Sequence, residues 1–327
     1  MKYSAYYVEE TDGAFSASIS ELELEKPLDG FVQIQVSFSS LNYKDALSAS
    51  GNKGVTRNYP FVPGIDAAGT ISDANSSNFV EGDEVLVTGY DMGMNTPGGF
   101  GEFINVPANW VVKKPSALTS IEAMSIGTAG LTAAASVLKI QESTQESDLP
   151  VLVSGATGGV GSIGVMLMSK LDKEVTAVTG KSSSVDFLKS IGAKNVILRD
   201  DFLEGPAKPM ERALFSSAID TVGGNILSKM LSQISPHGVV ACCGNVAGIE
   251  VNTTVFPFIL RGITLAGIDS AESSLKFKNS VWKKLAKEWK LDLSPIIKVV
   301  TKENLQQEID LILQGCQQGR VVLKHGE

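Results

Sequence analysis

SGATGGVG, at residues 154–161, is the stretch that decides the fold of this chain of 327 residues. It follows the apolar run 150–153 and precedes 162–171, which has the pattern of a helix. Glycine lacks Cβ, so backbone N–H groups in such a turn can approach a phosphate closely. The helix that begins there directs the positive end of its dipole at the same point. The stretch therefore predicts a dinucleotide site at the start of a β-α unit.

The segments after the glycine turn repeat this alternation of strand and helix. Helical patterns, such as 162–171 and 183–191, separate most of the apolar runs. Repeated β-α units indicate an α/β fold with a parallel, doubly wound sheet of the Rossmann type. We expect its strands at 150–153, 174–179, 195–199, 218–222, 238–243 and 263–269.

The first 120 residues have a different pattern. Short β-like runs, divided by Gly, Pro and Asn, indicate an irregular β-rich domain with strands at 31–36, 67–72, 84–88 and 103–106. The period changes near Ser120, a plausible N-cap for the helix that follows. We therefore expect a β-rich domain at 1–120 and a nucleotide-binding domain at 121–270. The tail, 271–327, is expected to hold helices at 274–289 and 302–314 and a strand at 320–324.

Composition narrows the class of protein further. The net charge is −8, from 28 basic and 36 acidic residues, which argues against a nucleic-acid groove and against docking on an anionic membrane. The N-terminus lacks the pattern of a signal peptide. Three cysteines without framework spacing suggest a reducing compartment, so we expect a cytoplasmic protein.

The end of the second strand in the β-α series indicates which dinucleotide binds. NAD sites usually carry Asp or Glu there for the ribose hydroxyls. This strand instead ends Thr179-Gly180-Lys181-Ser182, without a carboxylate and with a cation that suits a 2′-phosphate. We expect NADPH, although Lys181 on its own could be an ordinary solvated lysine.

A metal mechanism is not expected. The only histidines are His237 and His325, and the N-terminal region has neither His nor Cys, the usual zinc ligands. Short-chain dehydrogenases are disfavoured as well, because no tyrosine has a lysine four residues later.

Segments along nearly the whole chain resemble the zinc-free medium-chain dehydrogenase/reductase superfamily, and most closely its acrylyl-CoA reductase branch, also called the YhdH/YhfP family. In zinc-dependent relatives, residues 64–66 would read Gly-His-Glu, whereas Ile65 stands here in place of the ligand. The resemblance implies a GroES-like catalytic domain at 1–120, completed by 271–327, and a Rossmann domain at 121–270. It is carried by SLNYKD (40–45), YPFVPGIDAAGT (59–70), GTAGLTA (127–133), SGATGGVG (154–161), AIDTVGG (218–224), PFILRG (257–262), GIDS (267–270) and QGRVVL (318–323).

The same resemblance implies a set of cofactor contacts. Residues 157–160 would hold the pyrophosphate, Lys181 and its neighbours the 2′-phosphate ribose, and Asn195 would approach the adenosine. Tyr43, Thr128 and Thr132 would lie by the nicotinamide or its ribose. The full set is Tyr43, Thr128, Thr132, Thr157, Gly158, Gly159, Val160, Thr179, Gly180, Lys181, Asn195, Asn245, Asp269 and Arg320.

The implied activity is reduction of an activated C=C bond, most closely that of acrylyl-CoA, with NADPH as hydride donor. Negative charge then develops on the carbonyl oxygen, which needs a donor, and the α-carbon needs a proton. Tyr43 is the first candidate donor and Asn42 the second; Arg57 could steer the CoA phosphates or a carbonyl. The alternatives are that Tyr43 only stacks on the cofactor and that Arg57 forms a surface ion pair.

Two other functions stay open at this point, a quinone or enone reductase and an NADPH-binding sensor without catalysis. Substrate pockets in this fold are built from loops, so the sequence separates these functions poorly. A homodimer is also expected, because the strand at 263–269 would end the nucleotide sheet and expose an edge.

Overall fold

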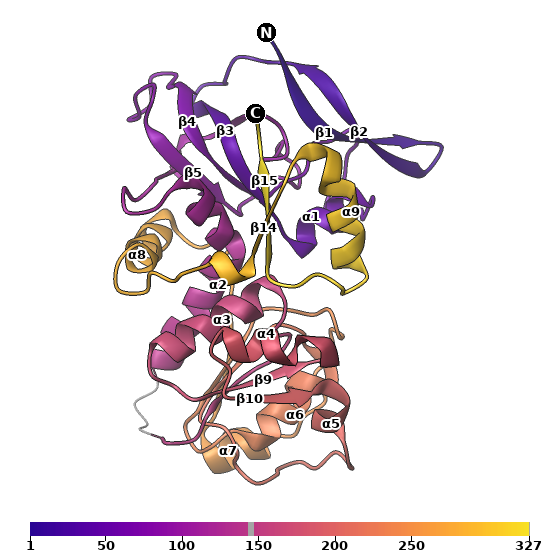
Figure 1. Cartoon of the computed structure of the whole chain (residues 1–327), viewed down its shortest axis with the longest axis vertical. Helices are drawn as coiled ribbons and strands as arrows, with labels where there is room; N and C mark the ends of the chain where they lie inside the picture. The colour runs from indigo at the N-terminus through magenta and orange to yellow at the C-terminus, as the bar shows by residue number, and fades with distance from the viewer. Residues whose placement is uncertain (143–146, 327) are drawn as a thin grey trace. The chain divides into compact units, whose positions relative to one another are not determined.

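The structure is a computed structural model that describes residues 1–142 and 147–326. The chain forms two compact units. Unit 1 comprises Met1–Thr128 and Ala271–Glu327, and unit 2 comprises Ala129–Ser270. Figure 1 shows the elements of each unit.

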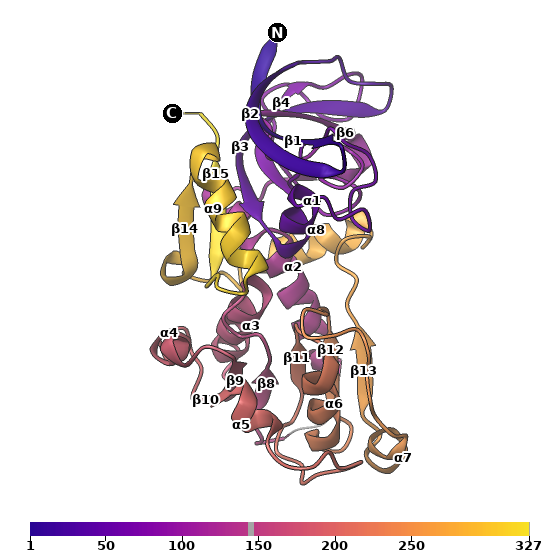
Figure 2. The same ribbon diagram turned by 90° about the vertical axis from the view of Figure 1, so that its right-hand side faces the viewer.

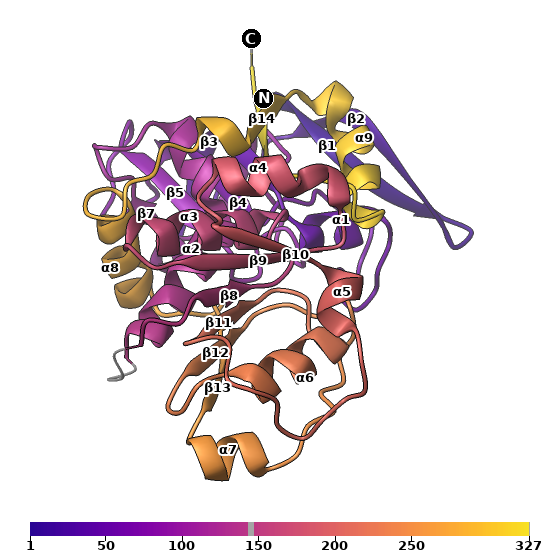
Figure 3. The same cartoon turned by 60° about the horizontal axis from the view of Figure 1, so that its bottom comes forward.

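Unit 2 is built around a parallel sheet in the order β10-β9-β8-β11-β12-β13. Figure 3 shows these strands side by side, with β13 at the edge of the sheet. The order reverses direction between β8 and β11, which is the topological switch point of a doubly wound sheet. The strands are β8 (Val151–Val153), β9 (Val175–Thr179), β10 (Asn195–Leu198), β11 (Ala218–Asp220), β12 (Val239–Cys242) and β13 (Thr264–Gly267).

These strands confirm the Rossmann-type sheet expected from the sequence, each one or two residues shorter at an end. Apolar side chains such as Leu152, Val178 and Val240 are fully buried against Ile226 and Met230 of α6, which forms the core on one face. The helices of this unit are α3 (Gly159–Lys170), α4 (Val185–Ser190), α5 (Arg199–Leu203), α6 (Gly224–Gln233) and α7 (Phe256–Arg261), with a 3-10 turn η2 at Ser182–Ser184.

Unit 1 holds a mostly antiparallel sheet in the order β14-β15-β3-β4-β5-β7, with β6 also paired to β3. This is the GroES-like domain. Its strands are β3 (Phe31–Leu41), β4 (Asp66–Asp73), β5 (Glu84–Thr88), β6 (Phe103–Pro107), β7 (Val112–Lys113), β14 (Ile297–Val300) and β15 (Arg320–Lys324). A separate hairpin, β1 (Lys2–Thr11) with β2 (Ala14–Glu23), was not expected from the sequence.

The C-terminal segment completes unit 1 because β15 adds to the sheet beside β3. Val321 to Lys324 pair antiparallel with Leu41 to Phe38. Figure 1 shows α9 (Lys302–Leu313) beside α1 (Tyr43–Ala49), and the buried Leu305 and Ile309 of α9 share a core with Leu41 and Ala46. The other helices of this unit are η1 (Ala108–Trp110), α8 (Leu275–Leu285) and η3 (Ser294–Ile296).

The helix α2 (Ser120–Gln141) is broken at Gly127, whose φ of 50° and ψ of −158° are not helical. The two units divide one residue later, at Thr128, rather than at the expected residue 120. The expected N-cap is also displaced. Thr119 rather than Ser120 forms the capping box, because Thr119 Oγ1 accepts from the Glu122 N–H and Glu122 accepts from the Thr119 N–H.

By length and composition alone, α2 is long and apolar enough to cross a membrane. In this fold, however, 78% of its most apolar window is buried against other residues of the chain. Its apolar composition is therefore accounted for by its position as a core helix.

Gly127→Ala should destabilise the protein by about 1–3 kcal/mol, since the residue has positive φ and its Cβ would lie 2.5 Å from the Asp66 carboxylate. Urea unfolding followed by circular dichroism measures this change. Gly13→Ala is the matched control: φ there is +79°, but nothing lies within 4 Å of its Cβ. Equal losses in both variants would show that only backbone strain, and not the buried carboxylate, requires glycine at residue 127.

Candidate cofactor and active site

Two positions of the glycine turn, residues 155 and 161, have no room for a side chain. Gly155 has a φ of +54°, and a Cβ there would lie 2.2 Å from Thr221 Oγ1. A Cβ on Gly161 would lie 2.3 Å from the Gly155 carbonyl oxygen, so the first turn of α3 packs directly on the loop. Gly158 precedes α3 in an extended conformation. Thr157, Gly158, Gly159 and Val160 thus lie where the helix begins, which is the position suited to a pyrophosphate.

The turn is bonded to the neighbouring strand β11. Ser154 Oγ donates to Asp220 Oδ1 at 2.8 Å, and Thr221 Oγ1 donates to the Ser154 carbonyl oxygen at 2.9 Å. Ser154 directly follows β8, Asp220 ends β11, and Thr221 follows it. These bonds therefore lie at the carboxyl edge of the parallel sheet, where ligands bind in this fold. The turn is therefore held in place before any ligand arrives.

The end of β9 lies at the same edge. Thr179 is buried, and its Oγ1 accepts from the Lys181 N–H at 3.0 Å, which shapes the bend after the strand. The guanidinium of Arg199 covers Gly180, because a Cβ on that glycine would lie 3.3 Å from the guanidinium. Arg199 was not identified from the sequence. Its side chain is 52% exposed beside the exposed Asp200, so it remains accessible to an anion.

Asn195 occupies a different place from the one expected. It is the first residue of β10, paired with Thr176, and its Nδ2 donates to Glu174 Oε1 at 3.2 Å. That position is the amino end of the strand, opposite the edge that carries the glycine turn. Arg199, directly after β10, lies instead at the carboxyl edge of the sheet.

The remaining candidates of unit 2 lie at the ends of later elements. Asn245 follows β12 in an exposed loop, and Asp269 follows β13, also exposed. Thr132 is buried in α2, and its hydroxyl lies 2.6 Å from the Ser270 hydroxyl. Thr132 therefore joins the start of unit 2 to its last residue.

Unit 1 holds a buried polar network around Asp66. Ser40 Oγ donates to Asp66 Oδ2 at 2.6 Å, and the Thr128 hydroxyl donates to Oδ1 at 2.6 Å. The Thr128 N–H and Asn42 Nδ2 also donate to this carboxylate. Thr128 is thus committed to a bond within unit 1.

Arg320 lies inside the same network and is 2% exposed. Its guanidinium donates to the Ser125 and Leu41 carbonyl oxygens at 3.0 and 3.2 Å and to Asn42 Oδ1 at 3.1 Å, and it lies 3.9 Å from Asp66 Oδ2. The family resemblance implied that Arg320 contacts the cofactor. The geometry instead directs its donors to groups within unit 1.

Asn42 and Tyr43 differ in how far their side chains are committed. Asn42 donates to Asp66 and to Asp45 and accepts from Arg320, so both ends of its amide are engaged. Tyr43 begins α1, is 37% exposed, and its hydroxyl has no hydrogen bond with any residue that the structure describes. Of the two candidate donors, Tyr43 is the one available to a ligand.

Asp45 is the most perturbed acid of this network. Burial, followed by the nearby charge of Asp66, raises the pKa of Asp45 to about 7, against the lowering effect of N–H donors from Asn42 and Ile65. The network therefore contains a carboxyl group with a raised pKa in the first turn of α1, two residues after Tyr43.

Arg57 lies in the exposed loop before Tyr59. The Arg57 side chain forms no ion pair with residues 1–142 or 147–326. The alternative that Arg57 serves only in a surface ion pair is therefore not supported among the described residues. Its backbone carbonyl accepts weakly from Lys53 at 3.4 Å.

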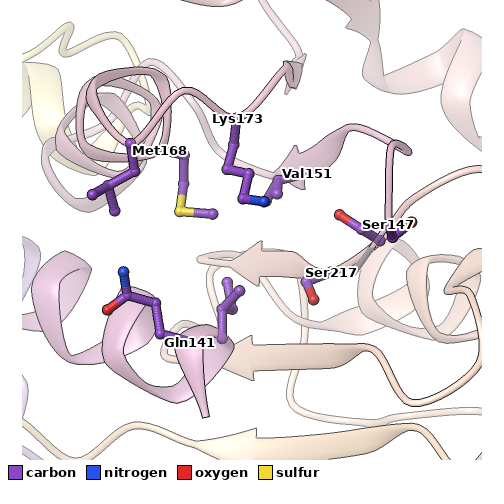
Figure 4. A pocket seen from close by; sticks show the side chains of 9 residues that line it. Gln141, Ser147, Val151, Met168, Lys173 and Ser217 are labelled. Atoms are coloured by element: carbon purple, nitrogen blue, oxygen red, sulfur yellow. The ribbon is translucent and has the colours of Figure 1, made fainter. Parts of the chain in front are cut away.

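A cavity of about 450 Å³ opens at the opposite edge of the unit 2 sheet (Figure 4). Val151, the first residue of β8, and Ser217, which precedes β11, line it together with Met168 and Lys173. Its position at the amino ends of the strands separates it from the glycine turn. This cavity is therefore not the dinucleotide site.

The residues present do not form a zinc site. Where zinc-dependent relatives carry a ligand, Ile65 is buried, and its N–H donates to Asp45. Among the described residues, no group of three or more His, Cys, Asp or Glu side chains could hold a metal ion.

Comparisons with known proteins agree with this architecture. Residues 29–116 match the alcohol dehydrogenase GroES-like domain, and residues 159–287 match the family model described as zinc-binding dehydrogenase. The probable acrylyl-CoA reductase AcuI of Escherichia coli is 42% identical over 86% of both chains. The putative quinone oxidoreductase YhfP of Bacillus subtilis is 40% identical over 98% of both chains.

Solved structures give the same relationship. The yhdH oxidoreductase of Salmonella enterica, in complex with NADP, matches with a TM-score of 0.94 at 39% identity and covers 99% of this chain and 100% of its own. Bacillus subtilis yhfP, solved with NAD bound, matches with a TM-score of 0.95 at 39% identity over 99% of both chains. The chain belongs to the medium-chain dehydrogenase/reductase family, and it is an oxidoreductase.

Lys181→Ala and Arg199→Ala should each weaken NADPH binding by about tenfold, because a charge-assisted bond to the 2′-phosphate is lost, and should leave NADH binding unchanged. Fluorescence titration with both cofactors measures this. Lys194→Ala is the control, since that lysine is bonded to Glu174 beside the amino end of β10. Equal affinity of the unmodified protein for NADPH and NADH would contradict the assignment.

Proposed function

We propose that this protein is an NADPH-dependent reductase of an activated C=C bond and that its acceptor is an α,β-unsaturated acyl-CoA thioester such as acrylyl-CoA. The observation that carries the proposal is the contrast between two neighbouring residues: the hydroxyl of Tyr43, the first residue of α1, has no hydrogen bond with any described residue, whereas the preceding Asn42 is fully bonded. Relatives named acrylyl-CoA reductase, from Escherichia coli and Ruegeria pomeroyi, are 42% and 37% identical and support the choice of acceptor.

The cofactor would be held by unit 2. Backbone N–H groups of residues 157–160, at the start of α3, would hold the pyrophosphate, and Lys181 and Arg199 would hold the 2′-phosphate. A relative solved in complex with NADP supports NADPH as the cofactor. Another relative was solved with NAD, so the contacts with the 2′-phosphate, which distinguish the two cofactors, are the contacts to test. When bound, NADPH supplies the hydride that reaches the β-carbon of the substrate.

The chain's own residues then have to stabilise the charge that develops on the thioester carbonyl oxygen. In this proposal the Tyr43 hydroxyl donates to that oxygen, in the manner of an oxyanion hole. Asn42 does not donate to substrate. Its amide, held by Asp66, Asp45 and Arg320, fixes the backbone from which Tyr43 projects.

Tyr43→Phe should lower kcat on the order of 10²-fold, because the donor to the oxyanion is lost while the ring remains. NADPH affinity should not change. Steady-state rates with acryloyl-CoA, followed as NADPH absorbance, measure the first effect, and fluorescence titration measures the second. Tyr7→Phe, on the β1 strand, is the matched control and should be fully active. Near-normal turnover of Tyr43→Phe would show that Tyr43 only stacks on the cofactor.

A second candidate function is reduction of quinones or enones, which the name of the Bacillus subtilis relative favours. The two are separated by NADPH oxidation with acryloyl-CoA and with a panel of quinones at matched concentration. Thioester turnover far above that of every quinone supports the first function, and the reverse order supports the second. NADPH binding without turnover of any acceptor would instead indicate the sensor.

We also propose a homodimer joined at the edge strand β13. Figure 2 shows α7 beside this strand. Both elements carry exposed apolar side chains. Ile259 and Leu260 are 68% and 63% exposed, Phe256 is 45% exposed, and Leu265 on the strand is 37% exposed. An open sheet edge next to such a surface is usually paired or covered, and a second copy supplies an identical edge.

Light scattering should give about twice the monomer mass of 34.6 kDa at micromolar concentration. Ile259→Asp together with Leu265→Lys should shift the mass to that of a monomer, because each places a charge on the apolar surface. Val80→Asp, an exposed apolar residue of unit 1, is the control. A monomer mass for the unmodified protein would refute the dimer.

A further inference from the structure

Two adjacent thiols lie at the ligand-binding edge of unit 2. Cys242 is the last residue of β12 and Cys243 follows it, and both are half-buried. Their position beyond a parallel strand is the edge at which this fold binds its ligands.

Both thiols donate to the same residue. Cys242 Sγ donates to Asp220 Oδ2 at 3.6 Å, and Cys243 Sγ donates to the Asp220 carbonyl oxygen at 3.3 Å. Asp220 ends the neighbouring strand β11 and is fully buried. Its carboxylate also accepts from Ser154 Oγ at 2.8 Å and from the Gly223 N–H at 2.9 Å, so its position is fixed by the glycine turn and by the start of α6.

The charge of this carboxylate acts against ionisation of the thiols. Burial, and then the charge of Asp220, raises the pKa of Cys242 to about 11 and that of Cys243 to about 12. The other groups that face them are uncharged: the Ser136 hydroxyl of α2 faces Cys243, and the Gly244 N–H faces Cys242. Asp220 is therefore the charged neighbour that the two thiols share.

We propose that Asp220 keeps Cys242 and Cys243 as protonated thiols so that the electrophilic substrate of this enzyme does not alkylate its own site. This inference rests on the proposed function, since an α,β-unsaturated thioester accepts sulfur at the same β-carbon that accepts hydride. A thiolate adds there, a C–S bond forms, the C=C bond is lost, and the α-carbon takes a proton. A thiol whose proton is held toward Asp220 does not start this addition, because the thiolate is the nucleophile.

The test is alkylation by iodoacetamide, an electrophile that is not a substrate, followed at each cysteine by peptide mass spectrometry from pH 7 to pH 11. Cys316 is exposed and serves as the internal reference in every sample. In the unmodified protein, Cys242 should label far more slowly than Cys316 at pH 8 and should approach it only near pH 11. In Asp220→Asn, labelling of Cys242 at pH 8 should rise by about tenfold, the change in thiolate fraction for one pKa unit.

Ser154→Ala is the matched control, because it removes one bond to the Asp220 carboxylate and keeps the charge. It should not raise labelling of Cys242. Equal acceleration in Ser154→Ala and Asp220→Asn would show that loosening of the site, not charge, exposes the thiol, and would overturn the proposal. Unchanged labelling in Asp220→Asn at every pH would do the same, since burial alone would then protect Cys242.

A second measurement does not depend on the variants folding equally well. The unmodified protein is incubated with acryloyl-CoA at pH 8 without NADPH, and the adduct at each cysteine is quantified. Cys316 should be alkylated and Cys242 should not, and adducts at equal rates would overturn the proposal. Because no turnover is measured, this outcome is separate from the failure of the proposed reductase activity.

Discussion

The organisation of unit 1 depends on one buried carboxylate, that of Asp66. A carboxylate without partners in the interior is strongly destabilising, so the chain brings donors to it from several elements. Ser40 comes from the end of β3, Asn42 from the start of α1, Thr128 from the break in α2, and Arg320 from β15. These bonds explain why α2 is interrupted, why residue 127 must be glycine, and why the C-terminal strand belongs to the first unit.

The same principle distinguishes the residues that support the site from those that can act on a ligand. Asn42 and Arg320 are polar and near the candidate site, but their donors are used inside the fold. The hydroxyl of Tyr43, by contrast, forms no hydrogen bond with any described residue. In unit 2, Asp220 is likewise internal: it fixes the glycine turn through Ser154, and its charge bears on the neighbouring thiols. The buried acids Asp66 and Asp220 thus bond the polar side chains around them, and a side chain that they do not bond, such as Tyr43, can contact a ligand.

The repeating local patterns of this chain could be predicted from sequence, and the long-range pairings could not. The unit 2 strands and the use of Gly155 and Gly161 followed from periodicity and from the steric needs of a tight turn. Arg199 was missed because the family resemblance suggested Asn195, although the expected strand 195–199 already places Asn195 at the amino end and residue 199 at the carboxyl edge of a parallel sheet. The Asp66–Arg320 pairing joins residues from opposite ends of the chain, and no local pattern marks it. The hairpin β1–β2 was missed even though Phe15, Ala17 and Ile19 of its second strand alternate with serines, a pattern that indicates a strand.

The central claim is that a hydride passes from NADPH to the β-carbon of an unsaturated thioester and that a separate proton reaches the α-carbon. The most direct measurement uses NADPH that carries deuterium at both C4 positions, with acryloyl-CoA in ordinary water, and locates the label in the product by NMR. The account predicts deuterium at the β-carbon alone, with a solvent proton at the α-carbon. Deuterium at the α-carbon, or a saturated product without label, would contradict it.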